Sequence, residues 1–102
     1  MPQLLGQRRR GSRVARLRVY TSFLRKRNQL SSPRLRDHVD AMLRTIELMP
    51  GVGSSLVEPS LKSRYGNNIY KALVSPYLIV YEYDREQDTV LVYDLVSCWA
   101  VH

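Results

Sequence analysis

A short basic segment contains the side chains of this sequence best suited to contact a nucleic acid. Lys62 and Arg64 lie two positions apart, and Tyr65 follows Arg64 directly. Cationic side chains neutralise phosphate groups, and an aromatic ring can stack on a nucleobase. Residues of these types also occur in solvent-exposed connections, so the segment by itself leaves both interpretations open.

The N-terminal quarter of the chain carries a second concentration of positive charge. Residues 1–27 hold nine of the sixteen Lys and Arg residues and no Asp or Glu, and the whole chain has a formal net charge of +7 at pH 7. This excess predicts an anionic partner, either a nucleic acid or an acidic protein. Residues 1–15 show no sustained periodicity and are expected to form a mostly disordered basic arm, for which a solubilising role is the alternative. Residues 16–102 are expected to form one domain.

Other catalytic or binding chemistry has little support in the sequence. The chain has no Gly-rich phosphate loop, no cluster of Cys and His and no Ser–His–Asp set that the sequence could justify, so no cofactor and no metal site are expected. Its single cysteine, Cys98, allows no internal disulfide and is expected to be an inert thiol. No stretch approaches the length of a membrane span and no apolar signal segment begins the chain, which predicts a cytoplasmic protein that contacts no membrane.

Three runs rich in Val, Ile, Leu and Tyr predict the strands that would position these side chains. They are Ile69–Val74, Tyr77–Asp84 and Thr89–Val96, joined by short links, and they predict an antiparallel meander. Strict alternation in the third run would place Val90, Val92, Asp94 and Val96 on one face. There, Asp94 would either face solvent or pair with a cation, and the pattern does not decide between the two.

The preceding segments predict one more strand and two helices. A strand of about five residues begins at Arg16, and Thr21 or Ser22 is expected to cap a short helix that ends near Gln29. Ser32 followed by proline predicts the start of a second helix, Pro33–Met49. Its apolar stripe is expected to pack on the sheet through four residues, Leu35, Val39, Leu43 and Ile46. Gly51–Asn67 is expected to be a loop. The fold class is therefore α+β, a small antiparallel-rich sheet with two helices packed on one face.

Two motifs resemble a known family. The second helix ends in Ile46-Glu47-Leu48-Met49-Pro50-Gly51-Val52-Gly53, and the middle strand of the meander reads Ser75-Pro76-Tyr77-Leu78-Ile79-Val80-Tyr81-Glu82-Tyr83-Asp84. With the β-α-α-β-β-β order and Lys71 on a strand, the chain from Arg16 onwards resembles the RelE/ParE superfamily of toxins from bacterial type II toxin–antitoxin systems, such as plasmid stabilisation proteins. The resemblance implies neutralisation by a cognate antitoxin protein.

The resemblance also implies two alternative targets. RelE-like members act as endoribonucleases that cleave mRNA in the ribosome, whereas ParE-like members poison DNA gyrase without enzymatic activity. A catalytically silent binding member is a third possibility, because Ser97-Cys98-Trp99 stands where many relatives carry His or Arg.

The resemblance implies two sets of site residues. The catalytic candidates for a ribonuclease are Lys71, Arg64, Tyr93 and His102. The candidates for binding nucleic acid are Lys62 and Arg64, next to the site of the ribonuclease, and the cluster Arg25, Lys26 and Arg27, which would belong to the surface patch of a gyrase poison.

Overall fold

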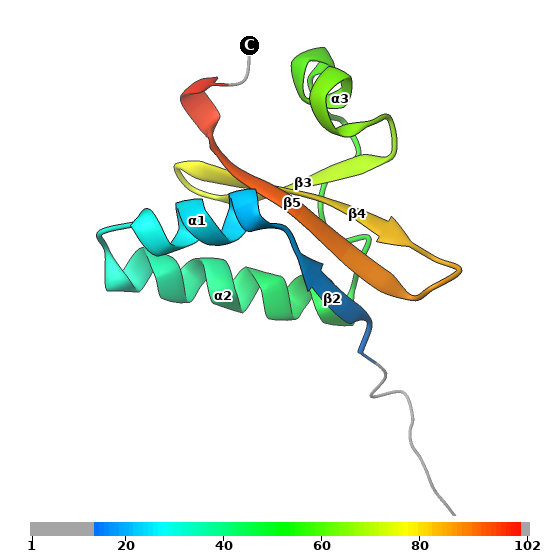
Figure 1. The fold of residues 1–102 in the computed structure, drawn as a ribbon, viewed down its shortest axis with the longest axis horizontal. Helices are drawn as coiled ribbons and strands as arrows, with labels where there is room; N and C mark the ends of the chain where they lie inside the picture. Colours follow the sequence, from blue (N-terminus) through cyan, green and yellow to red (C-terminus); the bar gives the residue numbers. More distant parts are fainter. Residues whose placement is uncertain (1–13, 101–102) are drawn as a thin grey trace, which may run out of the picture.

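The structure, a computed structural model, describes residues 14–100 as a four-stranded sheet with helices on both faces (Figure 1). The elements in chain order are β2 (Arg16–Val19), α1 (Thr21–Gln29), α2 (Pro33–Leu48), α3 (Pro59–Tyr65), β3 (Ile69–Val74), β4 (Tyr77–Asp84), β5 (Thr89–Ser97) and the 3-10 turn η1 (Cys98–Ala100). No helix in this part of the chain is long and apolar enough to cross a membrane.

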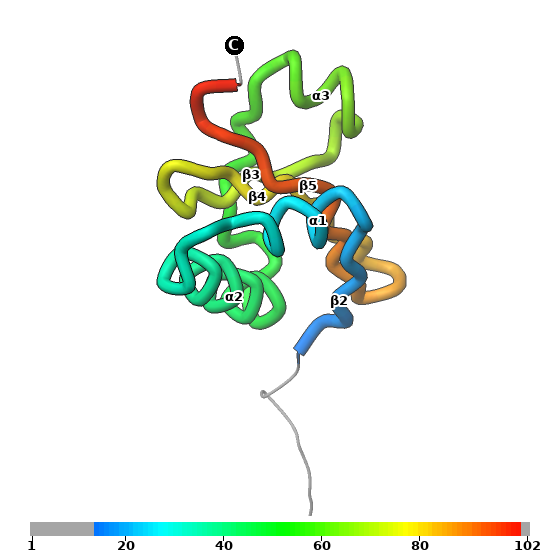
Figure 2. The backbone as a smooth tube through the Cα atoms, turned by 60° about the vertical axis from the view of Figure 1, so that its left-hand side comes forward, coloured from blue at the N-terminus to red at the C-terminus, as the bar shows by residue number. Residues whose placement is uncertain are grey.

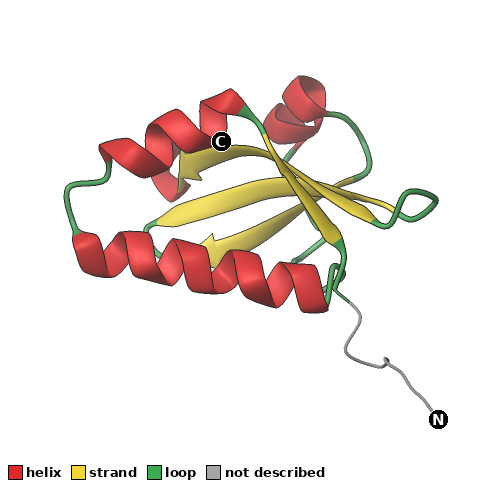
Figure 3. Cartoon of the chain, turned by 60° about the horizontal axis from the view of Figure 1, so that its bottom comes forward, coloured by secondary structure: helices red, strands yellow, loops and turns green. Residues whose placement is uncertain are grey.

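The sheet confirms the predicted meander and adds a parallel edge. Its strand order is β2-β5-β4-β3, with antiparallel pairing of β3 with β4 and of β4 with β5. The first strand, β2, runs parallel to β5 and pairs Arg16 with Thr89. The long connection that a parallel pair requires contains all three helices and two strands. Figure 3 shows the strands crossing behind the two longer helices.

The two predicted helices cover one face of the sheet, as expected (Figure 2). Phe23 of α1 and Val39 and Ile46 of α2 are fully or almost fully buried with Ile79 and Tyr81 of β4. The start of α2 also agrees with its sequence signal, since the Ser32 side chain accepts a hydrogen bond from the backbone N–H of Leu35 at 3.1 Å. The α+β prediction with two helices on one face is confirmed.

The start of α1 differs from the prediction. Its N-cap is Tyr20, without a side-chain capping bond, and Thr21 is already helical. The backbone N–H of Tyr20 instead donates to the carbonyl of Val92 at 2.9 Å, so the helix start is set by continuing the parallel pairing with β5. Ala15, assigned to the basic arm from the sequence, is buried and its N–H bonds to the carbonyl of Glu47 at 3.0 Å. Val14 beside it is 48% exposed, and residues 1–13 of the predicted arm lie outside the described residues.

The sequence predicted that the segment between α2 and β3 is a loop. The structure shows that it also contains a helix. Residues 59–65 form α3, which begins with Pro59 at the first helical position and lies on the face of the sheet opposite α2 (Figure 1). Leu61 of α3 and Val57 before it are buried there against Ile69, Leu78 and Val80. The seven residues of α3 are too few and too polar to show a helical periodicity in the sequence. The helix is stabilised mainly by its packing on the sheet.

A β-bulge overturns the alternation predicted for β5. The pairing passes from Tyr81–Val92 to Val80–Asp94, so Tyr93 is the extra residue on β5. Val90 and Val92 therefore face α1 and α2, whereas Asp94 and Val96 belong with the face covered by α3. The bulge brings Tyr93 and Asp94 towards α3 together, and this is what assembles the polar cluster described below.

Candidate active site

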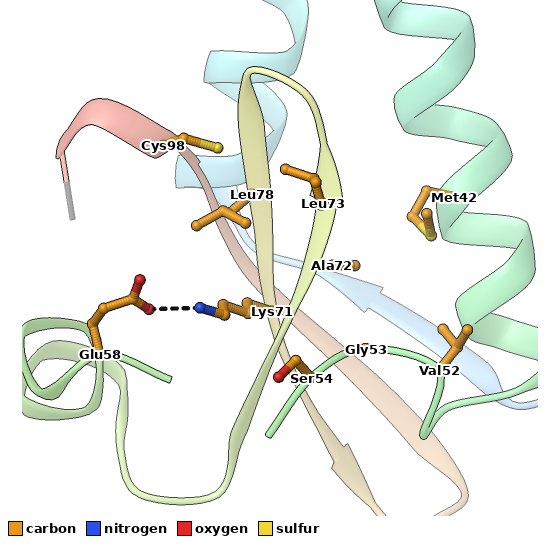
Figure 4. Close-up of a pocket in the computed structure, with 10 residues that line it drawn as sticks. All are labelled: Met42, Val52, Gly53, Ser54, Glu58, Lys71, Ala72, Leu73, Leu78 and Cys98. Atoms are coloured by element: carbon orange, nitrogen blue, oxygen red, sulfur yellow. Dashed lines mark hydrogen bonds and ion pairs between the residues drawn. The ribbon is translucent and has the colours of Figure 1, made fainter. Parts of the chain in front are cut away.

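A lysine and a glutamate meet between the sheet and the start of α3. Lys71 of β3 and Glu58, the residue before Pro59, form an ion pair with Nζ and Oε1 3.0 Å apart (Figure 4). The hydrogen bond from Lys71, together with a backbone hydrogen bond of Glu58 itself, lowers the pKa of the Glu58 carboxyl below its usual value. Glu58 is therefore ionised at neutral pH and can accept a proton.

This pair lies in a cavity of about 440 Å³ whose other walls are mostly apolar (Figure 4). Besides the ion pair, its lining residues are Met42, Val52, Gly53, Ser54, Ala72, Leu73, Leu78 and Cys98. Figure 4 shows Lys71 reaching from the strand towards Glu58, with Leu73 and Leu78 further along the same hairpin. Among these lining residues Lys71 is the one cation and Glu58 the one acid, so the described walls carry no net charge.

Val52, Gly53 and Ser54 form one wall of this cavity, and Ser54 holds the backbone of Lys71. The Tyr81 hydroxyl donates to the carbonyl of Pro50 at 2.7 Å and accepts from the N–H of Gly53 at 2.9 Å. Ser54 then exchanges two backbone hydrogen bonds of 2.9 Å with Lys71. A Cβ on Gly53 would lie 2.7 Å from the Tyr81 hydroxyl oxygen and 2.8 Å from the Lys71 carbonyl oxygen. Only glycine permits this close approach.

A second recess lies at the end of β5, between α1 and α3. It has a volume of about 460 Å³ and is lined by Lys26, Gln29, Leu30, Arg64, Tyr77, Leu95, Val96, Ser97 and Ala100. We call it the α1–α3 groove. It brings together two of the predicted nucleic-acid-binding residues, Lys26 and Arg64, which are far apart in the sequence.

Asp94 connects the groove to the sheet. Asp94 is only 4% exposed, and its carboxylate lies 3.0 Å from Lys26 Nζ. The Tyr65 hydroxyl and the backbone N–H of Leu95 donate to the same carboxylate. Burial and the hydrogen bond to Asp94 raise the pKa of Tyr65, so this phenol keeps its proton. The alternative that Asp94 pairs with a cation is therefore the one realised.

Tyr93, a catalytic candidate from the sequence, is engaged on both sides of its ring. Its hydroxyl donates to Glu82 at 3.0 Å, and its ring packs edge-on to Tyr20 and stacks on Tyr65, with centroids 5.0 and 6.2 Å away. Burial, with the hydrogen bond to Glu82, raises the pKa of Tyr93 to about 12. This environment favours a packed, protonated phenol, and a role of Tyr93 in proton transfer stays a prediction.

The structure separates the remaining predicted site residues. In the cluster on α1, Arg25 is exposed, Lys26 turns to Asp94, and Arg27 forms a bidentate ion pair with Asp40 of α2, with Nε and Oδ1 3.1 Å apart. On α3, half-buried Lys62 lines neither recess. Arg64 lies next to the ring of Tyr65, 6.0 Å from its centroid. His102 lies outside the described residues.

The sequence interpretation missed one residue that the geometry makes prominent, Glu58. It lies thirteen positions before Lys71, and no local spacing rule predicts that the two meet. The available signal was a Glu directly before Pro59, because Pro is favoured at the first position of a helix. Such a helix would have placed Glu58 at its cap, over the sheet.

Solved structures share this fold. The toxin–antitoxin complex RelBE2 from Mycobacterium tuberculosis contains a chain that matches with a TM-score of 0.67 and 22% identity, over 84% of this chain and 93% of that one. Isolated RelE toxin from E. coli matches with a TM-score of 0.63 and 18% identity, over 81% and 83% of the two chains. The archaeal RelE–RelB complex from Pyrococcus horikoshii matches with a TM-score of 0.63 and 10% identity, over 82% and 94%.

This chain therefore has the RelE toxin fold. The sequence itself matches no model of a known protein family, and no curated protein matches it. The similarity lies in the three-dimensional arrangement, while the site must be interpreted from this chain's own residues.

Proposed function

We propose that this protein is the toxin of a type II toxin–antitoxin system and that it inhibits translation by cleaving mRNA on the ribosome. The observation that carries the proposal is the Glu58–Lys71 pair, which places a proton acceptor and a cation 3.0 Å apart in an open cavity. RNA cleavage needs both, a base for the 2′-hydroxyl and positive charge for the phosphate. The shared fold with RelE toxins supports the same assignment.

The proposed reaction is an intramolecular transesterification, in which the RNA supplies its own nucleophile. The Glu58 carboxylate takes the proton of a 2′-hydroxyl, whose oxygen then attacks the adjacent phosphorus. The bond to the 5′ oxygen of the next nucleotide breaks, and that oxygen takes up a proton from water. The products are a 2′,3′-cyclic phosphate and a new 5′-hydroxyl end. Lys71 Nζ donates to the non-bridging oxygens and stabilises the charge that develops on them.

Substrate entry changes the partner of Lys71. In the described structure its ammonium is paired with Glu58, and a phosphate in the cavity would attract it from the other side. Because Glu58 becomes protonated in the reaction, its attraction for Lys71 falls as the phosphate charge grows. Lys71 is thus freed to interact with the phosphate as negative charge develops in the transition state.

A second function has one observation in its favour. Apart from the ion pair and Ser54, the cavity walls are glycine, apolar side chains and Cys98, and Leu73 at its rim is 60% exposed. Such a lining suits an apolar protein segment better than a phosphate. This observation favours the alternative of a non-enzymatic poison that binds a protein target such as DNA gyrase.

A cognate antitoxin is the partner that this surface requires in the resting cell. Large apolar side chains are exposed at the end of α2, in the loop that follows it and on β3, namely Leu48, Met49, Val52, Leu56 and Leu73. Exposed apolar groups of this kind typically mark an interaction surface. Co-purification with the product of a neighbouring small gene tests this partnership, and stable isolation of the chain alone from cells that express both genes contradicts it.

Cell-free translation with mapped mRNA ends tests the cleavage itself. The wild-type chain is expected to generate new 5′ ends only when ribosomes are present. Lys71→Ala is expected to lower cleavage about 100-fold or more, because it removes a contact to the developing charge. Arg85→Ala, which removes an exposed cation from the β4–β5 turn, is the control and is expected to cleave normally. Intact mRNA together with trapped gyrase–DNA complexes would favour the alternative function.

A further inference from the structure

The α1–α3 groove has the charge that the Lys71 cavity lacks. Lys26 and Arg64 both line it, and its described lining residues include no carboxylate. Gln29 and Ser97 add polar groups that can donate hydrogen bonds. Asp94 lies behind Lys26 and offsets part of its charge, whereas Arg64 is exposed and its nearest aromatic neighbour is the uncharged Tyr65. The groove therefore presents a net positive surface to a ligand.

The groove and the cavity share one wall. Ser97 and Ala100 line the groove, and Cys98, between them in sequence, lines the Lys71 cavity. On the neighbouring strand Tyr77 lines the groove and Leu78 lines the cavity. An extended chain that occupies one recess can thus continue over η1 into the other.

An exposed aromatic side chain lies in η1, next in sequence to the groove residue Ala100. Trp99 lies within η1, between Cys98 and Ala100, and is 78% exposed, the second highest exposure among the large apolar residues of the described chain. An exposed indole has no packing role in the described structure, and its flat face is a suitable platform for a nucleobase. Cationic side chains together with an exposed aromatic ring on a neighbouring turn are typical of proteins that bind single-stranded nucleic acid.

We propose that the α1–α3 groove is a second RNA subsite, in which Lys26 and Arg64 bind a backbone phosphate of single-stranded RNA and Trp99 stacks on a neighbouring base. The inference rests on the proposed function, because it assigns to the same RNA substrate a second point of attachment outside the Lys71 cavity. The subsite positions the strand and does not touch the scissile bond. Its cations neutralise phosphate charge on the strand. The described walls of the Lys71 cavity have no surplus cation for this.

Binding of a short fluorescence-labelled single-stranded RNA to the full chain tests the subsite without requiring cleavage. Lys71→Ala serves as the background in every sample so that the RNA stays intact. Arg64→Gln is expected to weaken binding about tenfold and to reduce the slope of log affinity against log salt by about 0.7, the value for one phosphate contact in a single strand. Arg85→Gln removes the same charge at the opposite end of β4 and β5 and is expected to change neither quantity.

Tryptophan fluorescence locates the binding, because Trp99 is the chain's single tryptophan. RNA is expected to quench its emission through stacking, while inorganic phosphate and an acidic peptide are expected to leave it largely unchanged. Quenching by the acidic peptide alone would assign the groove to a protein partner and overturn the proposal. Equal losses for Arg64→Gln and Arg85→Gln, or RNA binding without quenching, would overturn it as well. Failure of mRNA cleavage in the translation assay is a separate result that bears on the function of Glu58 and Lys71.

Discussion

The two recesses on either side of η1 place their cations in different surroundings. In the cavity, Lys71 faces Glu58 across 3.0 Å within mostly apolar walls, so the charges of the two side chains balance. In the groove, Lys26 and Arg64 stand among polar and apolar residues, and the buried acid Asp94 pairs with Lys26 alone of the two. A balanced pair in an apolar cavity suits proton transfer, whereas surplus charge in an open groove suits attachment of a polyanion. The cationic side chains in the two recesses are therefore suited to different roles because their neighbours differ.

Replacement of the cavity's acid should have the largest effect. Glu58→Gln keeps the size of the side chain but removes the proton acceptor, so cleavage is expected to fall by about 10²- to 10⁴-fold. RNA binding should change little. Glu86→Gln, in the exposed β4–β5 turn, is the matched control. Single-turnover cleavage of ribosome-bound mRNA measures the effect. If Glu58→Gln cleaved like the control, the cavity would be a binding site, and the contrast with the groove would disappear.

Removal of the groove's buried acid should affect stability instead. Asp94→Asn leaves Lys26 and Tyr65 facing an uncharged amide, and we expect it to lower the free energy of unfolding by about 2 to 3 kcal/mol, a value reduced because Lys26 is partly exposed. Urea denaturation measures this change, with Asp37→Asn on the exposed side of α2 as the control. If Asp94→Asn unfolded at the same urea concentration as the wild type, the contacts of Asp94 with Lys26 and Tyr65 would not stabilise the packing of α1 and α3 on the sheet.

The pH dependence should give the smallest effect. Since the hydrogen bond from Lys71 lowers the pKa of Glu58, its carboxylate stays ionised down to below the usual carboxyl value of 4.5. Cleavage by the free enzyme is therefore expected to be independent of this group from pH 8 to about pH 5. The ion pair's contribution to stability is present above the unfolded-state pKa and is lost as pH falls through the lower folded-state pKa. Unfolding of wild type and of Glu58→Gln between pH 7 and pH 3 should therefore converge at the acidic end. A rate that declined between pH 8 and pH 6 would assign the proton acceptor to another group.

Several helices and strands could be predicted from the sequence because their signals are local. Alternating Val, Ile and Tyr residues predicted β3, β4 and β5 because side chains on a strand alternate between two faces. Ser32 before Pro33 predicted the start of α2 because the cap and the first turn are neighbours in the chain. The motif that ends in Gly53 indicated the fold through its resemblance to a known family, and the structure adds a physical reason for the glycine, the close approach of Tyr81.

Which charged side chains meet depends on the packing of the helices on the sheet and could not be predicted from the sequence. Glu58 reaches Lys71 because α3 forms by packing on the sheet, and a seven-residue helix has little propensity of its own. Lys26 reaches Asp94, 68 positions away, because the bulge at Tyr93 turns that carboxylate towards α3 and α1 passes beside it. Electrostatic partners depend on distance in space, and a sequence records distance along the chain. The same physics divides the three adjacent cations on α1 among solvent, Asp94 and Asp40.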